Sequence, residues 1–306
     1  MRTNNDTQLA ANLARHVDRL ANVIGPRHVS QPAHFAAAAA YVERELADAG
    51  YTVARETYTA SGQEVANLVA ELPGDTKKHE VVIVGAHYDT VPTTPGADDN
   101  ASAVAMLIEV ARRMRGLRTA RTVRFVGFAC EEVPHFHTGE MGSQIHARAC
   151  KARGERICGM LCLEMVGFYA TGPGSQQVPP AIPRLFHGVL PKEGDFLAAV
   201  GNLRSWRLLR QFRRGFKRAT RFPLFSIGLP EVITEIRFSD NSSFWDQGSQ
   251  ALMITDTSFY RNPHYHMASD TPDTLDYERM AQATLGVVGG ACEAAGLHTC
   301  SSPEGP

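Results

Sequence analysis

The stretch EVVIVGAHYDTVPTTPGADDNASAVAMLIEVARRM, residues 80–114, decides the fold. It begins with a near-continuous run of β-branched residues from Glu80 to Ala86, which is typical of a strand buried on both faces. A polar, proline-containing loop follows, and Ala101 to Met114 then has the pattern of a helix. A buried strand followed by a helix is the repeating unit of a parallel sheet with helices on both faces.

The rest of the chain repeats this alternation of strands and helices, which predicts one α/β domain over residues 1–306. Residues 170–240 differ, because they are rich in proline, glycine and arginine, and we expect a lid or insertion within the same domain. The remaining strands are expected at 51–58, 65–71, 122–129, 157–163 and 250–255, and the helices at 9–24, 35–49, 142–153 and 272–295. Asp270 or Thr271 is the expected cap of the last helix.

Composition excludes several classes of protein. The 306 residues are 43% apolar, enough for one sizeable core, and 31 Lys and Arg balance 32 Asp and Glu. We therefore expect no nucleic-acid partner and no membrane partner, and the chain has no apolar run of about 18 residues. Its start has no pattern of a secretory signal, and six cysteines in a chain of this length do not form a disulfide scaffold. These features predict a cytoplasmic protein, and they leave its oligomeric state open.

Five short islands of the chain carry the side chains that bind metals. Most of them follow predicted strands, and in parallel sheets ligands bind beyond the carboxyl ends of the strands. The islands are His87-Tyr88-Asp89, Asp98-Asp99-Asn100, Glu131-Glu132, Leu163-Glu164-Met165 and His264-Tyr265-His266.

Imidazole and carboxylate donors suit zinc. His87 and His266 suit one metal each, and Asp99 has two oxygens with which to bridge two ions. Glu132 and Glu164 supply terminal carboxylates. His264 is an alternative to His266, and spacing alone does not choose between them. Two metals about 3.5–4 Å apart can activate one water molecule together, so the islands indicate a two-zinc hydrolase.

Such a water also needs a proton acceptor. Glu131 stands beside a ligand but points elsewhere on an extended chain, so it is the candidate general base. Asp89 lies two residues after His87 and faces the same side of an extended segment. It is therefore the candidate to orient the imidazole of His87.

Four strings of the sequence together resemble a known family, the co-catalytic zinc aminopeptidases of clan MH, which is peptidase family M28. The strings are GAHYDTVPTTPGADDNASAV, FVGFACEEV, LEMVGFY and SDNSSFWDQGSQALMITDTSFYRNPHYHMASDT. The resemblance runs in order from about Leu9 to the last helix. It implies a three-layer α/β/α sandwich with a mixed, mostly parallel central sheet.

The resemblance also implies roles for individual residues. One zinc would be held by His87, Asp99 and Glu164, and the other by Asp99, Glu132 and His266. Asp99 would bridge, Glu131 would be the base and Asp89 would support His87. The family places its histidine shortly before an aspartate, here Asp270, which favours His266 over His264.

Three positions depart from the family pattern. Glu164 stands where aspartate is commonest, Ala103 where glycine is usual, and Asn241 where many relatives have histidine. A glutamate remains a competent zinc ligand. Asn241 is a candidate substrate contact, and so are Tyr260, which could donate to an oxyanion, and Arg261.

A basic segment, Arg204 to Arg221, lies outside these islands. Eight of its residues are Arg or Lys and none is acidic, while Trp206, Leu209, Phe212 and Phe216 recur at helical spacing. This predicts an amphipathic helix with a solvated basic face. An anion-binding or partner surface is the alternative.

The sequence therefore predicts a two-zinc exopeptidase, most simply an aminopeptidase acting on peptides. A carboxypeptidase, an amidohydrolase or a glutaminyl-cyclase-like enzyme with one zinc remains open on the same scaffold. A non-catalytic binding module is the remaining alternative, although such a protein should have lost ligands or the base.

Overall fold

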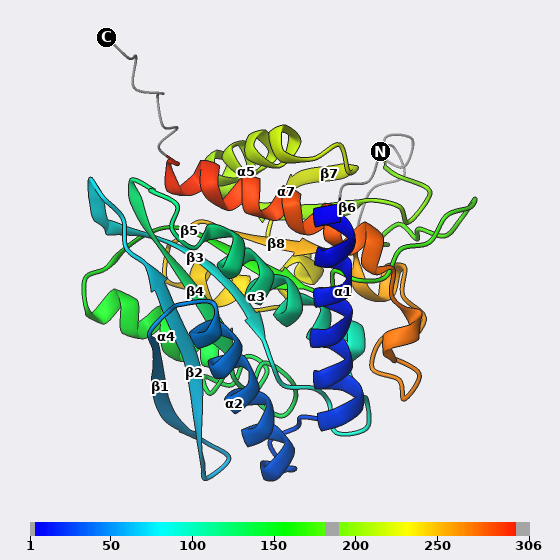
Figure 1. Ribbon diagram of the computed structural model, residues 1–306, viewed down its shortest axis with the longest axis horizontal. Helices are drawn as coiled ribbons and strands as arrows, with labels where there is room; N and C mark the ends of the chain where they lie inside the picture. The colour runs from blue at the N-terminus through cyan, green and yellow to red at the C-terminus, as the bar shows by residue number, and fades with distance from the viewer. Residues whose placement is uncertain (1–3, 181–189, 298–306) are drawn as a thin grey trace.

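The computed structural model describes residues 4–180 and 190–297. Within these residues eight strands form one sheet in the order β1-β2-β4-β3-β5-β8-β6-β7 (Figure 1). Neighbours are parallel from β4 through β3 and β5 to β8 and again between β6 and β7, and antiparallel at β1–β2, β2–β4 and β6–β8. The strands are β1 (Val53–Ala60), β2 (Gln63–Leu72), β3 (Lys77–His87), β4 (Arg121–Phe128), β5 (Arg156–Glu164), β6 (Leu197–Asn202), β7 (Leu224–Leu229) and β8 (Ala251–Thr255).

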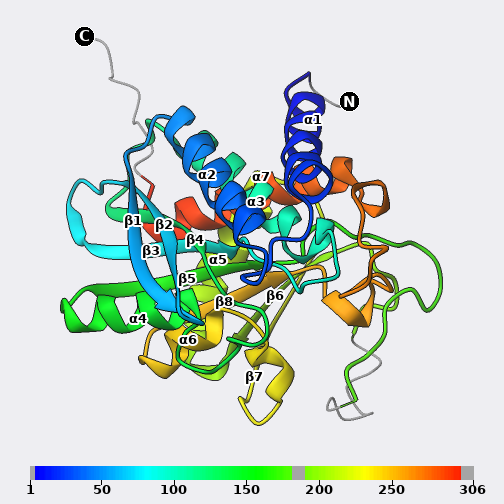
Figure 2. The ribbon, with the colours of Figure 1, turned by 90° about the horizontal axis from the view of Figure 1, so that it is seen from below.

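Helices cover both faces of the sheet (Figure 2). On one face lie α1 (Asn4–Asp18), α2 (Pro32–Asp48), α3 (Ala103–Met114), α5 (Trp206–Ala219) and α7 (Tyr277–Ala295). On the other face lie α4 (Gly142–Ala152) and the short α6 (Asn241–Asp246). Each face has its own apolar core. The predicted three-layer sandwich with a mixed, mostly parallel sheet is therefore confirmed.

The β-branched run of residues 80–86 lies at the centre of this sheet. β3 lies between β4 and β5, and its residues from Glu80 to His87 are all buried. Gly85 is required here, because a Cβ atom at this position would lie 2.4 Å from the ring of Phe128. Such burial on both faces explains why β3 reads as an unbroken apolar run and not as an alternating one.

Two parts of the fold differ from the sequence prediction. The predicted cap of the last helix is wrong, because α7 begins at Tyr277 and the side chain of Asp276 accepts the N–H of Arg279. The segment 170–240 adds two strands, β6 and β7, to the edge of the main sheet, which the sequence did not indicate. Residues 181–189 of the predicted lid lie outside the described residues, and its action as a lid stays a prediction.

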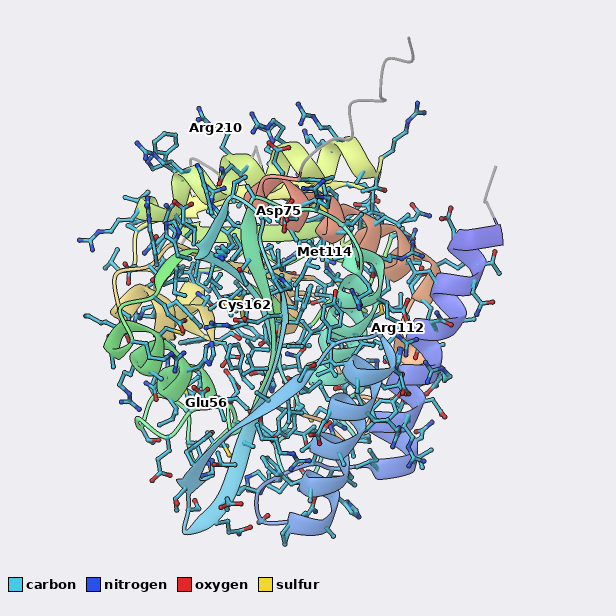
Figure 3. All side chains as sticks on the ribbon, turned by 60° about the vertical axis from the view of Figure 1, so that its left-hand side comes forward. Glu56, Asp75, Arg112, Met114, Cys162 and Arg210 are labelled. Atoms are coloured by element: carbon cyan, nitrogen blue, oxygen red, sulfur yellow. The ribbon has the colours of Figure 1, made fainter. Side chains whose placement is uncertain are left out.

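The basic segment forms α5, which packs along α7 and covers β6 and β7. Leu208, Phe212 and Phe216 are buried, whereas Arg210 stands on the outer side of the helix (Figure 3). Among the described residues, no helix has both the length and the apolar character that crossing a membrane requires.

Candidate metal centre

The proposed ligands come from the ends of three neighbouring strands. His87 is the last residue of β3, Glu164 is the last residue of β5, and Glu131 and Glu132 follow β4 after a short turn. Because these strands are parallel and adjacent, their carboxyl ends meet at one edge of the sheet. Two loops, one with Asp99 and one with His266, reach the same edge.

Two groups of side chains, joined by one shared carboxylate, have the arrangement of metal ligands. His87, Asp99 and Glu164 form one group, and Asp99, Glu132 and His266 form the other. Oδ1 of Asp99 lies 3.4 Å from Nε2 of His87, and Oδ2 of Asp99 lies 3.1 Å from Nε2 of His266. Each oxygen of Asp99 therefore faces a different histidine, as a bridging ligand must.

A terminal carboxylate completes each group and lies close to its histidine. Oε2 of Glu164 lies 3.4 Å from Nε2 of His87, and Oε1 of Glu132 lies 3.4 Å from Nε2 of His266. Ser239 donates a hydrogen bond to Oε2 of Glu164 over 2.6 Å, which fixes that carboxylate.

These residues fit a pair of divalent cations. Both ring nitrogens of His87, Oδ1 of Asp99 and Oε1 of Glu132 are buried and have no hydrogen-bond partner. Buried polar atoms are rarely left unpaired, because an unmade bond costs about 1–3 kcal/mol. Cations coordinated by Nε2 of His87, Oδ1 of Asp99 and Oε1 of Glu132 would satisfy these three atoms and neutralise the carboxylates. Nδ1 of His87 faces Asp89 instead.

The electrostatics of the cluster lead to the same conclusion. Burial, together with the neighbouring Asp99, raises the pKa of Glu132 to about 7. Burial opposes the charge of His266, but the nearby carboxylates of Asp99 and Glu132 outweigh this and raise its pKa to about 10. Burial also raises the pKa of Glu164. The protein alone therefore stabilises the charged forms of Glu132 and Glu164 less than bound cations would.

Glu131 and Asp89 lie beside the two groups without belonging to either. Oε2 of Glu131 is 3.9 Å from Nε2 of His87, and burial raises the pKa of Glu131 well above its usual value. Asp89 accepts the backbone N–H groups of Glu131 over 3.1 Å and of Glu132 over 3.0 Å. Its Oδ1 is also 3.5 Å from Nδ1 of His87, so it orients both the imidazole and the turn that carries the glutamates.

Two supporting residues were not recognised from the sequence in these roles. Asp270 accepts the backbone N–H of Asp98 over 2.8 Å and of Asp99 over 3.1 Å, so it holds the loop of the bridging ligand. Arg27 is buried, and its guanidinium donates to carbonyl groups that include those of Pro95 and Gly96. Asp270 had at least a signal, since it follows the His266 island, whereas nothing in the sequence marks Arg27.

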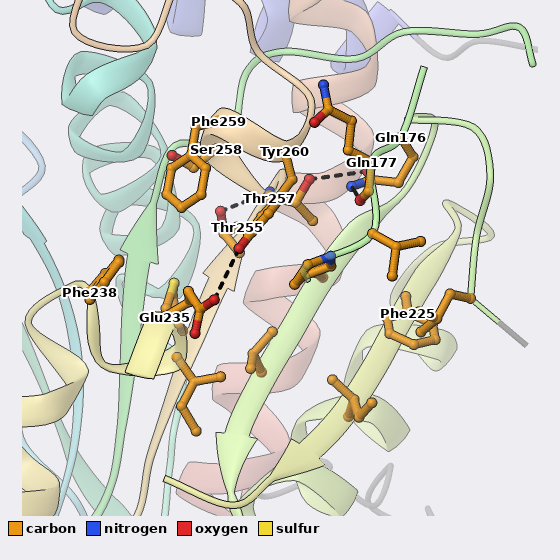
Figure 4. A pocket seen from close by; sticks show the side chains of 18 of the residues that line it. Gln176, Gln177, Phe225, Glu235, Phe238, Thr255, Thr257, Ser258, Phe259 and Tyr260 are labelled. Carbon is orange, nitrogen blue, oxygen red and sulfur yellow. Dashed lines mark hydrogen bonds between the residues drawn. The ribbon is translucent and has the colours of Figure 1, made fainter. Parts of the chain in front are cut away.

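A pocket opens beside the metal centre (Figure 4). Glu164 is one of its lining residues, and alternate residues of β6, β7 and β8 form its floor, including Val200, Ile227 and Met253. The intervening residues Leu197 and Ile254 belong to the core on the other face, so the pocket lies on the face of the sheet opposite α5. The cavity has a volume of about 160 Å³, and most of its lining comes from the segment 170–240.

The structure separates the three residues predicted to contact substrate. Tyr260 lines the pocket, with its hydroxyl 3.4 Å from Glu235. Arg261 is buried behind the lining and donates to the carbonyl groups of Phe168 and Phe196. Asn241 is fully buried at the start of α6 and donates to the carbonyl of Ile236. The structure therefore brings only Tyr260 to the pocket wall.

His264, the alternative to His266 as a ligand, lies apart from both ligand groups. His264 is hydrogen-bonded through Nδ1 to the hydroxyl of Ser269 over 2.9 Å, outside both ligand groups. His266 is the member of this island that reaches Asp99.

Comparisons with known proteins show which proteins this chain resembles. The chain is 36% identical to the uncharacterized protein YfbL of Escherichia coli (strain K12), over 90% of this chain and 85% of that protein. It is 28% identical to a probable leucine aminopeptidase of Trichophyton verrucosum, of which it spans about half, 54%.

Solved structures agree in fold. The structure of BSAP, a zinc aminopeptidase from Bacillus subtilis, has a TM-score of 0.69 at 15% identity and covers 94% of this chain and 95% of its own. The glutaminyl cyclase of Fimbriiglobus ruber has a TM-score of 0.67 at 20% identity, covering 93% of this chain and 95% of its own. The model of peptidase family M28 matches residues 67–289, a span that contains all the proposed ligands, and the chain belongs to this family.

Proposed function

We propose that this protein is a two-zinc aminopeptidase that removes the first residue of a peptide. The observation that carries the proposal is the geometry of Asp99, whose two oxygens face two different histidines. His87, Asp99 and Glu164 would hold one zinc ion, and Asp99, Glu132 and His266 the other. Zinc bound there would lower the pKa of a water molecule and polarise the scissile carbonyl.

Glu131 is the residue that handles the proton in this proposal. Its carboxylate is beside the ligand groups but in neither of them, and burial raises its pKa well above the usual value. A raised pKa suits a group that must take a proton from water and release it again to the leaving amine. Asp89 holds the backbone of Glu131 in place.

The pocket supports an exopeptidase, because the proposed ligand Glu164 is among its lining residues and most of the others are apolar. A side chain of the first residue of a peptide would enter it while the free amine and the scissile bond stay at the metal centre. Relatives named as probable leucine aminopeptidases also support cleavage at the amino-terminal end of the peptide.

The test combines metal content with activity. We expect about two zinc ions per chain, and chelator-sensitive release from aminoacyl p-nitroanilides that returns when zinc is added. The second candidate is a glutaminyl cyclase, which the structural neighbour favours. Conversion of an amino-terminal glutamine to pyroglutamate, with about one zinc ion per chain and no p-nitroaniline release, would replace the aminopeptidase proposal with this one.

A further inference from the structure

The pocket contains a carboxylate that the proposed chemistry does not use. Glu235 lines the pocket and is half-buried, and its side chain extends toward Tyr260 (Figure 4). Its hydrogen bonds come from two neutral donors, the hydroxyl groups of Tyr260 and Thr234, each over 3.4 Å. Among the described residues, no Lys, Arg or His forms an ion pair with it.

Neighbouring acids do form ion pairs, so the lack of one is particular to Glu235 and not general to its segment. Glu231 and Asp246 both form ion pairs with Arg237, two residues from Glu235 in the chain. Arg237 therefore turns away from the pocket, and the pocket lining as described includes no Lys, Arg or His. Glu235 is left as an uncompensated negative charge on an otherwise largely apolar wall.

Loading the centre with metal would leave this charge in place. Divalent cations bound there would be surrounded by carboxylates of their own, those of Asp99, Glu131, Glu132 and Glu164, with Asp89 close by. Glu235 belongs to neither ligand group, so it would remain the negative charge of the pocket. Because apolar walls lower the local dielectric, a cation that enters the pocket would be attracted to it more strongly than in water.

A line of aromatic side chains connects this carboxylate to the metal centre. Tyr260, which donates to Glu235, lies next to Phe259 with ring centroids 4.5 Å apart. Phe259 lies 5.5 Å from Tyr265, whose ring stacks on His266 at 3.8 Å. Burial and the neighbouring Glu235 raise the pKa of Tyr260 to about 12, so its hydroxyl stays a donor to this carboxylate.

We propose that Glu235 selects peptides whose first residue has a long aliphatic stem ending in a cation, as lysine and arginine do. The methylene groups would lie along the apolar floor formed by residues such as Ile227 and Met253, and the cation would meet Glu235. This inference rests on the proposed function, since it assumes that the scissile bond is held at the metal centre.

The test uses two substrates that differ only in the cation. Lysine and norleucine have the same four-carbon stem, so zinc-loaded protein is assayed with lysyl and norleucyl p-nitroanilides. We expect the ratio of kcat/KM for lysyl over norleucyl to fall roughly tenfold in Glu235→Gln, mainly through a higher KM of the lysyl substrate. In the wild type the ratio should also decrease as salt screens the pair.

Two further variants isolate the charge of Glu235. Glu235→Asp keeps the charge and should retain more of the lysyl preference than Glu235→Gln. Glu231→Gln removes an acid from the same segment, but one that is paired with Arg237 and does not line the pocket, so the ratio should not change. Zinc content and the melting temperature of each variant show whether it is folded.

A binding measurement separates failure of this inference from failure of the proposed function. The dissociation constants of L-lysine hydroxamate and L-norleucine hydroxamate are measured by calorimetry on wild type and Glu235→Gln. If both p-nitroanilides are cleaved but the ratio is the same in both proteins, the inference is overturned and the proposed function stands. If neither is cleaved, the proposed function fails, and equal binding of the two hydroxamates to wild type then overturns the inference too.

Discussion

Glu131 and Glu132 are adjacent in the chain, yet their carboxylates reach different partners. Glu132 belongs to a ligand group with Asp99 and His266, whereas Glu131 belongs to none. We therefore expect Glu131→Gln to keep its zinc and lose roughly 100- to 10,000-fold in kcat, the range of a missing general base. Glu132→Gln is the matched control and should lose metal as well as turnover. Zinc content is measured by mass spectrometry and turnover by initial rates. Near-normal turnover of Glu131→Gln would show that Glu131 is not the general base.

Asp99 is the only residue shared by the two ligand groups found among the described residues. Its replacement should therefore affect both metals, whereas loss of a histidine should affect one. We expect Asp99→Ala to purify with almost no zinc, and His87→Ala and His266→Ala to keep about one ion each. Atomic absorption after dialysis against a fixed low zinc concentration measures this. Equal loss in all three variants would show that the two ions do not bind as separate groups around a bridge.

The residues at the centre illustrate what a sequence can and cannot reveal. His87, Glu132 and Glu164 were predictable because buried strands end directly before them, and parallel strands place their ends together. Glu235 was not, because its importance depends on Arg237 turning toward other acids, which only the folded chain determines. Arg27 was missed for the same reason, since carbonyl groups that it binds, those of Pro95 and Gly96, are far from it in the sequence.

Elements with a strong pattern were predictable to within a few residues. Strands β3 and β4 contain buried β-branched residues and β5 has a buried apolar run, and the structure places all three where the pattern indicates. Strands β6 and β7 were missed, because LAAVGN and LFSIGL combine alanine, glycine and serine with few β-branched residues. Their pairing at the edge of the sheet depends on β8 and on α5, contacts that no local pattern encodes.

The packing of α5 on α7 depends on glycine at the contact. A Cβ atom at Gly215 would lie 2.1 Å from the carbonyl oxygen of Gly289 and 2.6 Å from its carbon. In a helix alanine is more favourable than glycine by about 1 kcal/mol. The added Cβ atom would, however, clash with backbone atoms of Gly289, and no change of side-chain rotamer can relieve that clash.

We therefore expect Gly215→Ala to lower the free energy of unfolding by about 1–3 kcal/mol. Urea unfolding followed by circular dichroism measures the change. Gly228→Ala is the control, because a Cβ atom there has only the carbonyl oxygen of Asn202 nearby, at 3.8 Å. If the Gly215 variant were as stable as wild type, the two helices would have to be able to separate without loss.

At the scale of the whole molecule, the metal centre joins parts of the chain that are far apart in sequence. The ligands come from β3, the turn after β4, the end of β5 and two loops, so bound cations would link both halves of the sheet through one buried cluster. Without cations, burial disfavours the charges of Glu131, Glu132 and Glu164 and raises the pKa of each. Metal that binds only the folded chain stabilises it by mass action, by about 2.7 kcal/mol per site at a free concentration one hundred times Kd.

Removal of zinc should therefore lower the melting temperature by at least ~5 °C, because 1 kcal/mol shifts a domain of this size by roughly 2–4 °C. Differential scanning fluorimetry of protein treated with chelator and then dialysed, with and without added zinc, measures the shift. Asp99→Ala is the matched control, since it lacks the bridge and its melting temperature should not respond to zinc. An equal zinc response in wild type and Asp99→Ala would mean that the stabilising metal binds elsewhere, and that the shared carboxylate does not connect the two halves of the sheet.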